Sequence, residues 1–259
     1  MTMKAIAIIP ARIGSTRLPR KILREIAGKT MLERVVTAAL GCKQLAGVIV
    51  ATDSEEILAV CRAHGWDARM TSAECRSGTD RVREVAQSVE ADVYINVQGD
   101  EPLARPEHLD ALLGPMLADK NGTVEVSTIA TPCKPEDITN PNAVKVVTDA
   151  FGRALYFSRA AIPFDRDGPS NHGGLTAKAG PQAIEYKKHL GFYAYRKGAL
   201  DRFCQWPEST LERAERLEQL RFLQNGVEIH VAMTPYDTIG VDTEDDLKRV
   251  EAIIRITEK

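Results

Sequence analysis

The sequence lacks the cysteine patterns that mark disulfide frameworks and structural zinc sites. Its 259 residues include five cysteines, which are scattered, odd in number and never spaced as CxxC. Small disulfide-stapled domains and zinc ribbons need cysteines at short, regular spacings. We therefore expect the cysteines to be reduced and mainly structural.

Long apolar runs and a strong charge of one sign are also missing. No stretch of about 18 apolar residues is present that could span a bilayer. The first four residues lead into a strand without the apolar core of a secretory signal. The formal net charge is only −2, which gives no global electrostatic reason to bind nucleic acid. These absences predict a globular cytoplasmic protein with no membrane insertion and no nucleic-acid partner.

Neither of the two common glycine motifs for nucleotide binding is complete. Gly28-Lys29-Thr30 resembles the end of a Walker A loop, but that motif needs a glycine at the position of Leu23. No GxGxxG follows a strand, so a dinucleotide-binding fold has no positive support. We therefore expect phosphates to bind at a different loop.

A cluster of cations is present near the start of the chain. Residues 11–30 contain six basic residues and one acidic residue, and they follow an apolar strand pattern at residues 4–9. Pro10 ends that strand where a parallel sheet opens its ligand crevice. Gly14 permits a backbone bend that turns amide groups toward an anion, and Ser15 adds a hydroxyl donor. The cations expected to surround a triphosphate here are Arg12, Arg17, Arg20 and Lys21. A solvated basic loop is the alternative interpretation.

Strand and helix patterns alternate through the first half of the chain. The strand patterns lie at 6–10, 47–51, 66–70 and 93–97. The helix patterns lie at 31–40, 54–64, 78–88 and from 106 to about 118. This alternation predicts an α/β fold with a mostly parallel central sheet and helices on both faces.

The second half is less regular. Residues 142–147 and 153–157 predict the strands of a β-hairpin, and residues 165–183 are rich in Gly, Pro, Asn and Asp, which predicts a mobile loop. The remaining patterns predict a strand at 191–195, a helix at 211–223, a strand at 227–232 and a last helix from about Thr243. The simplest account is one domain of residues 1–259, with a hairpin and loop inserted at about 140–195.

Two aspartates are candidates for a metal site. Asp100 follows the apolar strand at 93–97, so it lies just past the carboxyl end of that strand, facing the crevice. Mg²⁺ is commonly held by one or two protein carboxylates while phosphates and water complete its octahedron. Asp242 is the second candidate ligand. The alternatives are that Asp100 only organises the turn with Gly99, and that Asp242 or Thr243 is the N-cap of the last helix.

The chain resembles one enzyme family through motifs that cover nearly its whole length. The motifs occupy residues 8–21, 77–81, 96–102, 140–147, 154–159, 162–166, 189–193, 217–221 and 240–243. In this order they resemble the 3-deoxy-manno-octulosonate cytidylyltransferases. The related CMP-sialate synthetases share the Ile-Pro-Ala-Arg start, but they usually lack the Gln-Gly-Asp-Glu-Pro segment found at 98–102.

The resemblance implies a fold, a reaction and partners. The expected fold is a single-domain nucleotidyltransferase similar to the nucleotide-diphospho-sugar transferases. The implied reaction transfers CMP from CTP to the anomeric hydroxyl of 3-deoxy-manno-octulosonate (Kdo), releases pyrophosphate and supplies lipopolysaccharide synthesis. Mg²⁺ is the implied cofactor. A homodimer formed through the inserted region is the implied assembly.

The resemblance also implies roles for individual residues. The implied catalytic residues are Lys21, Asp100 and Asp242, of which Asp100 and Asp242 are the metal ligands. The implied nucleotide-binding residues are Arg12, Ser15, Arg17, Lys21, Ser77, Gly78 and Arg81. The implied sugar-acid-binding residues are Gln98, Arg159, Arg166, His189, Tyr193, Glu218 and Gln219. Among these, Arg159 is expected to face the sugar acid, with His189 as a hydrogen-bond donor.

Some of these residues have ordinary structural interpretations. His189 and Tyr193 are also typical of structural or half-buried positions. Glu218 fits a solvated helix face, on a helix that Ser209 and Glu212 can cap as a box. Ser77 also fits a helix cap.

The chain departs from the family at one position and leaves two other functions open. The family usually has Leu-Pro-Gly-Lys-Pro where this chain has Leu18-Pro19-Arg20-Lys21-Ile22, so Arg20 leaves the loop geometry open and can add a phosphate contact. The competing functions are transfer to another sugar acid, such as an 8-amino analogue or a sialic acid, and nucleotide sensing without turnover.

Overall fold

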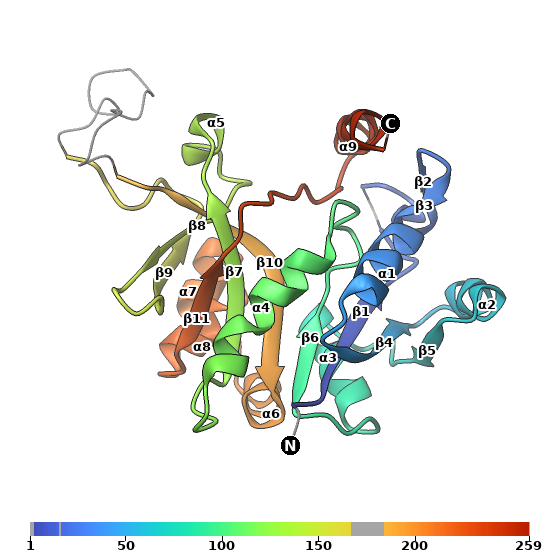
Figure 1. Cartoon of the computed structure of the whole chain (residues 1–259), viewed down its shortest axis with the longest axis horizontal. Helices are drawn as coiled ribbons and strands as arrows, with labels where there is room; N and C mark the ends of the chain where they lie inside the picture. Colours follow the sequence, from blue (N-terminus) through green and yellow to red (C-terminus); the bar gives the residue numbers. More distant parts are fainter. Residues whose placement is uncertain (1–2, 16, 167–183, 259) are drawn as a thin grey trace.

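A computed structural model describes residues 3–15, 17–166 and 184–258, and every structural statement below refers to these residues. Nearly all of the predicted mobile loop at 165–183 lies outside them. Figure 1 shows the chain with its elements labelled. Among the described residues, no helix is both long and apolar enough to cross a membrane.

The described residues form one nine-stranded sheet. Seven strands follow one another across it in the order β11 (Ile229–Met233), β7 (Val126–Pro132), β10 (Lys187–Arg196), β6 (Val93–Asn96), β1 (Ala5–Ala11), β4 (Leu45–Thr52) and β5 (Asp67–Met70). The pair β8 (Lys145–Thr148) and β9 (Ala154–Ser158) extends from β10. β1 pairs in parallel with β4 and β6, whereas β10 runs antiparallel to β6 and β7. The prediction of a mostly parallel sheet is confirmed, and β10 is its main exception.

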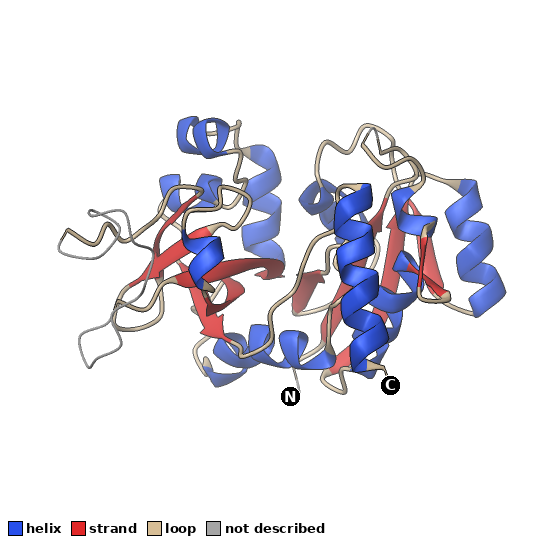
Figure 2. Ribbon diagram, turned by 90° about the horizontal axis from the view of Figure 1, so that it is seen from above, coloured by secondary structure: helices blue, strands red, loops and turns tan. Residues whose placement is uncertain are grey.

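Helices cover both faces of this sheet, as Figure 2 shows. The longer ones are α1 (Met31–Gly41), α2 (Glu55–His64), α3 (Gly78–Ala86), α4 (Pro106–Ala118), α6 (Lys197–Gln205) and α9 (Glu244–Thr257). The short elements are η1 (Lys21–Leu23), α5 (Pro135–Ile138), α7 (Thr210–Glu215), α8 (Leu220–Gln224) and the hairpin of β2 (Glu25–Ile26) with β3 (Lys29–Thr30).

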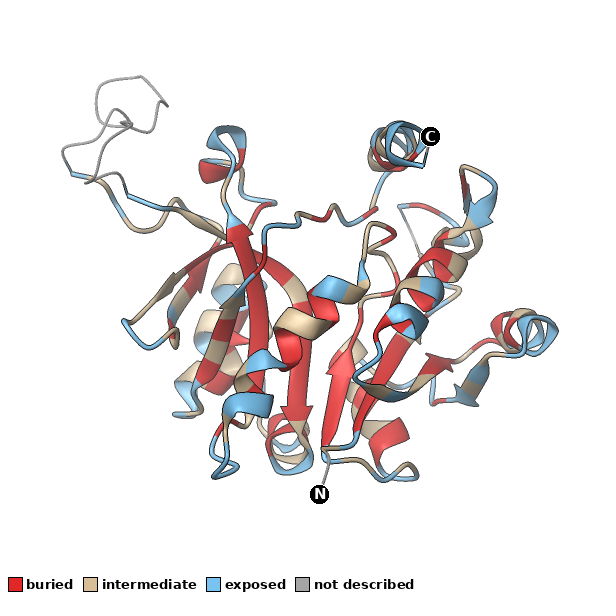
Figure 3. Cartoon of the chain, viewed as in Figure 1, coloured by how far each residue is buried: buried red, intermediate tan, exposed pale blue. Residues whose placement is uncertain are grey.

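The alternation of side chains along β1 explains the two main cores. Ala7 and Ile9 point into a core with α1 and α4, while Ile8 points into a second core with α3, α6 and α8. Because both faces of β1 are covered, the strand is apolar at nearly every position. Figure 3 shows these buried strands between more exposed helices.

The predicted elements of the first half are confirmed to within a few residues. Two later elements were missed, and one predicted helix is wrong. β7 and α6 were not predicted at all. The expected helix at 211–223 is instead α7 and α8, because Arg216 adopts a left-handed conformation (φ 56°, ψ 46°) that ends α7. The broken helix has a functional consequence, since it leaves Glu218 and Gln219 in the connection between α7 and α8.

The carboxyl ends of β1 and β6 meet at one edge of the sheet. Residues 234–243, which we call the strap, connect β11 to α9 and cross this edge at the top of Figure 1. The strap brings Asp242 to the loop that follows β6, where Asp100 lies. This edge is where open α/β sheets bind their ligands.

Candidate active site

The loop after β1 makes a left-handed turn at Arg20. Arg20 has φ 56° and ψ 31°, immediately before η1, so among the described residues of this loop the left-handed conformation belongs to Arg20 and not to Gly14. Its guanidinium pairs with Glu56 of α2. Arg20 therefore adopts the backbone geometry that a glycine would adopt without strain, and its side chain extends to a neighbouring helix.

Lys21 joins the two predicted metal ligands. Its Nζ lies 2.8 Å from Asp100 Oδ2 and 2.9 Å from Asp242 Oδ1, and Arg17 Nη2 lies 3.0 Å from Asp242 Oδ2. Burial opposes protonation of Lys21, but the charges and hydrogen bonds of the two aspartates together raise the pKa of Lys21. Burial likewise opposes ionisation of Asp242, yet Lys21 and Arg17 hold the pKa of Asp242 below its ordinary value. Lys21 and Asp242 are therefore both charged at neutral pH.

Local backbone packing places both aspartates. A Cβ on Gly99 would lie 2.6 Å from the Pro10 carbonyl oxygen, so only glycine lets the loop after β6 approach the end of β1 this closely. Thr243 is the N-cap of α9 and forms a capping box with Asp246. Because Thr243 takes the capping role, the Asp242 carboxylate is available to the cluster. The Asp100 carboxylate likewise extends to Lys21.

The donor set fits a metal ion that binds together with a phosphate ligand. Among the residues that the structure describes, no group of three or more His, Cys, Asp or Glu side chains could hold a metal by itself. Two carboxylates are what a protein commonly contributes to Mg²⁺ when substrate phosphates supply further oxygens. Asp100 and Asp242 share Lys21 as a neighbour, so they lie close enough to act together.

A cavity of about 2020 Å³ extends from this cluster across the carboxyl edge of the sheet. The sequence-predicted site residues that line it are Arg17, Ser77, Gln98, Arg159, His189, Tyr193, Glu218, Gln219 and Asp242. Lys21 and Asp100 contact Asp242 directly. The structure therefore brings predicted nucleotide-binding residues and predicted sugar-acid-binding residues together around this cavity.

The start of α3 forms one wall of the cavity. Ser77 is the N-cap of α3 and forms a capping box with Asp80, so its alternative structural role is confirmed. Gly78 follows Ser77, and a Cβ there would lie 3.4 Å from Pro10 Cγ, so α3 begins close against the end of β1.

Arg81 does not face this cavity. Its side chain is completely buried, donates to Thr71 Oγ1 over 2.6 Å and pairs with Asp53. It therefore braces the ends of β4 and β5 from inside the protein. Arg81 Nε has no hydrogen-bond partner among the described residues, and the expected contact of Arg81 with a nucleotide stays a prediction.

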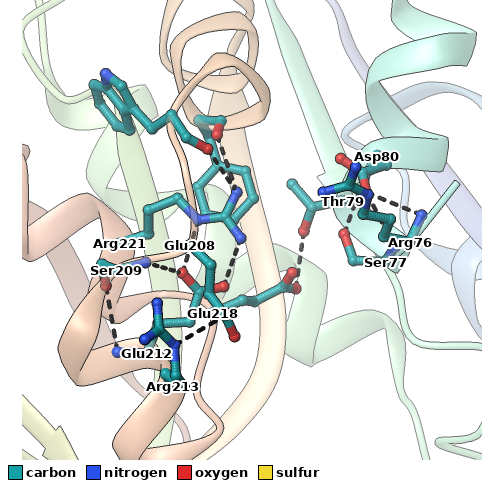
Figure 4. Close-up of polar contacts among 12 residues, drawn as sticks. Arg76, Ser77, Thr79, Asp80, Glu208, Ser209, Glu212, Arg213, Glu218 and Arg221 are labelled. Atoms are coloured by element: carbon teal, nitrogen blue, oxygen red, sulfur yellow. Dashed lines mark hydrogen bonds and ion pairs between the residues drawn. The ribbon is translucent and has the colours of Figure 1, made fainter.

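The connection between α7 and α8 forms the opposite wall. Glu218 accepts a hydrogen bond of 2.9 Å from Thr79 Oγ1, which joins the two walls, as Figure 4 shows. Burial raises the pKa of Glu218, although hydrogen bonds from Thr79 and Ser77 oppose that shift. Glu212 forms the expected capping box with Ser209, confirming the predicted cap, and it also holds the Arg221 guanidinium at 2.5 and 2.8 Å.

β10 contributes buried neutral groups to the cavity. The centroid of the His189 ring lies 5.0 Å from that of Phe157 and 5.4 Å from that of Tyr193. Burial lowers the pKa of His189 to about 3. His189 is therefore neutral at physiological pH. Two buried polar atoms of the cavity wall, Tyr193 Oη and Gln219 Nε2, have no hydrogen-bond partner among the described residues. Buried polar atoms are normally paired, so these two atoms are candidates for ligand contacts.

Arg159 is held rigidly at the cavity edge. Its Nε donates to the Glu215 carbonyl over 2.7 Å and its Nη1 to the Pro141 carbonyl over 2.9 Å. Carbonyl partners fix the guanidinium without neutralising its charge. Arg159 therefore stays a cation that can attract a carboxylate.

Comparisons with known proteins show the family of this chain. The sequence profile of the cytidylyltransferase family matches residues 6–229. A 3-deoxy-manno-octulosonate cytidylyltransferase of Koribacter versatilis (strain Ellin345) is 69% identical over 254 residues, which cover 98% of this chain and 91% of the relative. One from Acidobacterium capsulatum is 54% identical over 253 residues, which cover 98% and 97%. The chain belongs to the 3-deoxy-manno-octulosonate cytidylyltransferase family.

Solved structures support the same family and the fold. A structure of CMP:2-keto-3-deoxy-manno-octonic acid synthetase complexed with CTP is 40% identical, with a TM-score of 0.88 and coverage of 98% of this chain and 99% of that one. A 4-diphosphocytidyl-2C-methyl-D-erythritol synthase from Anaerococcus prevotii shares the fold at 15% identity and a TM-score of 0.63. The predicted nucleotidyltransferase fold is confirmed, and the chain is a cytidylyltransferase.

Three family-derived residues are not among those that line the cavity. Arg12 is exposed on the loop after β1, and Ser15 Oγ accepts a hydrogen bond of 3.4 Å from the Leu18 amide in the same loop. Arg166 is exposed at the end of the segment that the structure describes before residue 167. Their assigned roles in this family member stay predictions.

Two residues that sequence reasoning missed contact the site. Thr128 of β7 lies 3.0 Å from His189 Nε2, and Glu101 accepts a hydrogen bond of 2.6 Å from Thr238 of the strap. Burial and the nearby charge of Asp100 raise the pKa of Glu101 to about 8. Glu101 follows Asp100 directly in the Gln-Gly-Asp-Glu-Pro segment, which is a signal that sequence reasoning could have used. Thr128 gives no local signal.

Proposed function

We propose that this protein transfers CMP from CTP to the anomeric hydroxyl of Kdo and releases pyrophosphate. The observation that carries the proposal is the charged cluster of Lys21, Asp100 and Asp242 beside a cavity whose lining includes neutral polar side chains as well as Arg159. The related synthetase at 40% identity is complexed with CTP, which supports CTP as the nucleotide. The relatives' names support Kdo as the acceptor.

The cations of the first loop act at the triphosphate end. Arg17 and Lys21 counter the repulsion between an anionic sugar acid and an anionic nucleotide, so the two substrates can approach. Asp100 and Asp242 hold Mg²⁺, which when bound stabilises charge on the phosphates and on the departing pyrophosphate. Catalysis by this chain is then mainly alignment and electrostatic stabilisation, because phosphoryl transfer asks for little covalent chemistry from the protein.

The sugar acid binds against β10 and the connection between α7 and α8. Tyr193 Oη and Gln219 Nε2, which have no hydrogen-bond partner in the described part of the chain, suit a substrate rich in hydroxyl groups. Arg159 supplies the positive charge for the sugar carboxylate. Neutral polar groups together with the fixed charge of Arg159 discriminate a sugar acid from a neutral sugar.

His189 contributes an acceptor to this wall. Thr128 Oγ1 donates its only proton to the Phe192 carbonyl, which lies 2.7 Å away, so it accepts from His189 Nε2–H at 3.0 Å. In neutral His189 the other nitrogen, Nδ1, then carries a lone pair. The hydrogen-bond network thus favours His189 Nδ1 as the acceptor of a hydrogen bond from a sugar hydroxyl group. The sequence had instead led us to expect His189 as a hydrogen-bond donor.

The proposal includes a homodimer, a cytoplasmic location and a role in lipopolysaccharide synthesis. Support for the dimer comes from exposed apolar side chains in the inserted region, where Phe151 is 79% exposed, Leu155 62% and Phe164 75%. Large exposed apolar side chains gathered in one region often mark a protein contact. Light scattering of Leu155→Glu against the wild-type chain tests it, since a monomeric wild type excludes the dimer.

The test of the proposed reaction is pyrophosphate release with each of the four NTPs and a panel of sugar acids. We expect turnover with CTP and Kdo to exceed that of every other pair by at least about tenfold, since the site pairs its polar groups with one substrate. Faster turnover with an 8-amino analogue or a sialic acid contradicts Kdo as the acceptor. CTP binding without turnover on any acid contradicts the enzyme assignment.

A further inference from the structure

The two carboxylates of the proposed metal site belong to segments that are far apart in sequence. Asp100 lies in the loop after β6, and Asp242 lies on the strap. The strap contains no strand or helix. Its position relative to the Asp100 loop must therefore be fixed by side chains and single backbone contacts. The position of Asp242 relative to Asp100 depends on those contacts.

Two hydrogen bonds clamp the strap onto the Asp100 loop. Thr238 Oγ1 donates to Glu101 Oε2 over 2.6 Å, and the Val241 amide donates to the Asp100 carbonyl oxygen over 2.9 Å. Gly240 lies between these bonds, and a Cβ there would be 3.4 Å from Glu101 Oε1. Thr238 is only 3% exposed, so water does not compete freely for its hydroxyl.

The strap is anchored again just before Thr238. Asp237 pairs with Lys188 of β10 at 2.9 Å and with Lys134 at 2.8 Å. The Thr238 amide donates to Asp237 Oδ1 over 2.9 Å. These contacts fix the start of the strap to the sugar side of the cavity. On the nucleotide side, the bond from Thr238 to Glu101 joins the strap to the Asp100 loop, and Asp242 adds its pairs with Lys21 and Arg17.

We propose that Glu101 and Thr238 are positioning residues that set the separation of Asp100 and Asp242 for metal binding. This inference rests on the proposed function, because it takes the two aspartates as metal ligands. The Thr238 hydroxyl acts through the strap, and Glu101 acts through its own loop. A misplacement of about 1 Å at a catalytic group can cost on the order of 10²-fold in rate, so a single buried hydrogen bond at this point has a measurable effect.

The test measures metal binding directly in the complex with CTP. Mn²⁺ serves as the probe, and electron paramagnetic resonance measures the free ion. We expect Thr238→Val, which keeps the side-chain shape, to weaken Mn²⁺ binding by about fivefold or more, the usual scale for one lost hydrogen bond. Thr238→Ser, which restores the hydroxyl, should return the affinity to within about twofold of wild type. CTP affinity without metal should be unchanged in both variants.

A matched control is available on the same strap. Thr234 is also buried, and its Oγ1 accepts from the Tyr236 amide at 3.3 Å within the strap. Thr234→Val should therefore leave Mn²⁺ affinity at the wild-type value. Wild-type affinity in Thr238→Val overturns the inference, and so does a failure of Thr238→Ser to restore binding.

Asp242→Asn in the same assay separates this inference from the proposed function. Wild-type Mn²⁺ affinity in Asp242→Asn means that the metal site itself is assigned wrongly. Weak binding in Asp242→Asn, together with wild-type binding in Thr238→Val, rejects only the positioning role. If Thr238→Val fails to fold, Thr238→Ala removes the same hydroxyl without adding bulk. Weaker Mn²⁺ binding in Thr238→Ala then supports the inference, and wild-type binding overturns it.

Discussion

The two sides of the cavity bind their substrates through different interactions. We call the side with Lys21, Asp100 and Asp242 the nucleotide wall, and the side formed by β10 and the connection between α7 and α8 the sugar wall. The nucleotide wall is a cluster of charges at the carboxyl ends of parallel strands, where Lys21 lies between Asp100 and Asp242. The sugar wall includes Arg159 and the buried neutral groups His189 and Tyr193 on the antiparallel strand β10. One protein can therefore bind two anions next to each other. It screens the charge of the nucleotide with cations and recognises the sugar acid mainly through hydrogen bonds.

Removing charge from the nucleotide wall should have the largest effect. Asp100→Asn or Asp242→Asn keeps the side-chain shape but removes the negative charge that holds the metal. We expect kcat to fall by at least about 10²-fold, a typical scale for losing a major electrostatic stabiliser. CTP binding should persist through the cations of the first loop. Steady-state assays of the purified variants measure both quantities, and wild-type turnover in either variant removes that aspartate from the metal site.

Removing the fixed cation of the sugar wall should have the next largest effect. A charge-assisted hydrogen bond contributes about 1.5–3 kcal/mol, so Arg159→Ala should raise the apparent KM for Kdo by one to two orders of magnitude. The KM for CTP should change much less. Saturation curves for each substrate give the comparison. If the CTP curve moves and the Kdo curve does not, Arg159 belongs to the nucleotide site.

The neutral character of the sugar wall can be tested by the pH dependence of stability. Burial lowers the pKa of His189 to about 3, below the ordinary value of 6.5, so the folded state disfavours its protonation. The stability linked to His189 is fully present above pH 6.5 and is lost as pH falls toward 3. In urea titrations, His189→Gln should therefore lose less stability than wild type over this range. Parallel curves for the two proteins contradict a buried neutral histidine.

The smallest expected effect concerns the left-handed turn at Arg20. A non-glycine residue in this conformation costs about 1 kcal/mol or more, and the exposed pair with Glu56 offsets at most about 1 kcal/mol of it. Arg20→Gly should therefore change stability by less than about 1 kcal/mol. Arg20→Ala keeps the strain and loses the pair, so it should be less stable than Arg20→Gly. If the two variants are equally stable in urea titrations, residue 20 is not strained by a left-handed conformation.

Sequence patterns predicted the nucleotide side of the fold well because its determinants are local. The apolar run of β1, the cap at Ser77 and the aspartate after β6 all act within a few residues of their own positions. Asp100 and Asp242 could be selected by their places beside a strand and a helix. Their meeting at Lys21 could only be inferred from the family resemblance.

The sugar side was predicted less well because distant contacts determine it. β7 contains Ser127 and Thr128, which interrupt its apolar pattern, and both are buried because they donate to the carbonyls of Leu112 and Phe192. The left-handed Arg216 divides a segment that has a continuous helical pattern. No local pattern predicts these features, since each depends on partners from other elements.

Amide hydrogen exchange with each substrate added separately tests the division of the cavity most directly. CTP with Mg²⁺ should slow exchange in the first loop, in the loop of Asp100 and at the start of α3. Kdo alone should slow exchange in β10 and in the connection between α7 and α8, with little effect on the first loop. Protection of the first loop by Kdo alone, or equal protection of both walls by CTP, would mean that the two substrates do not occupy separate walls.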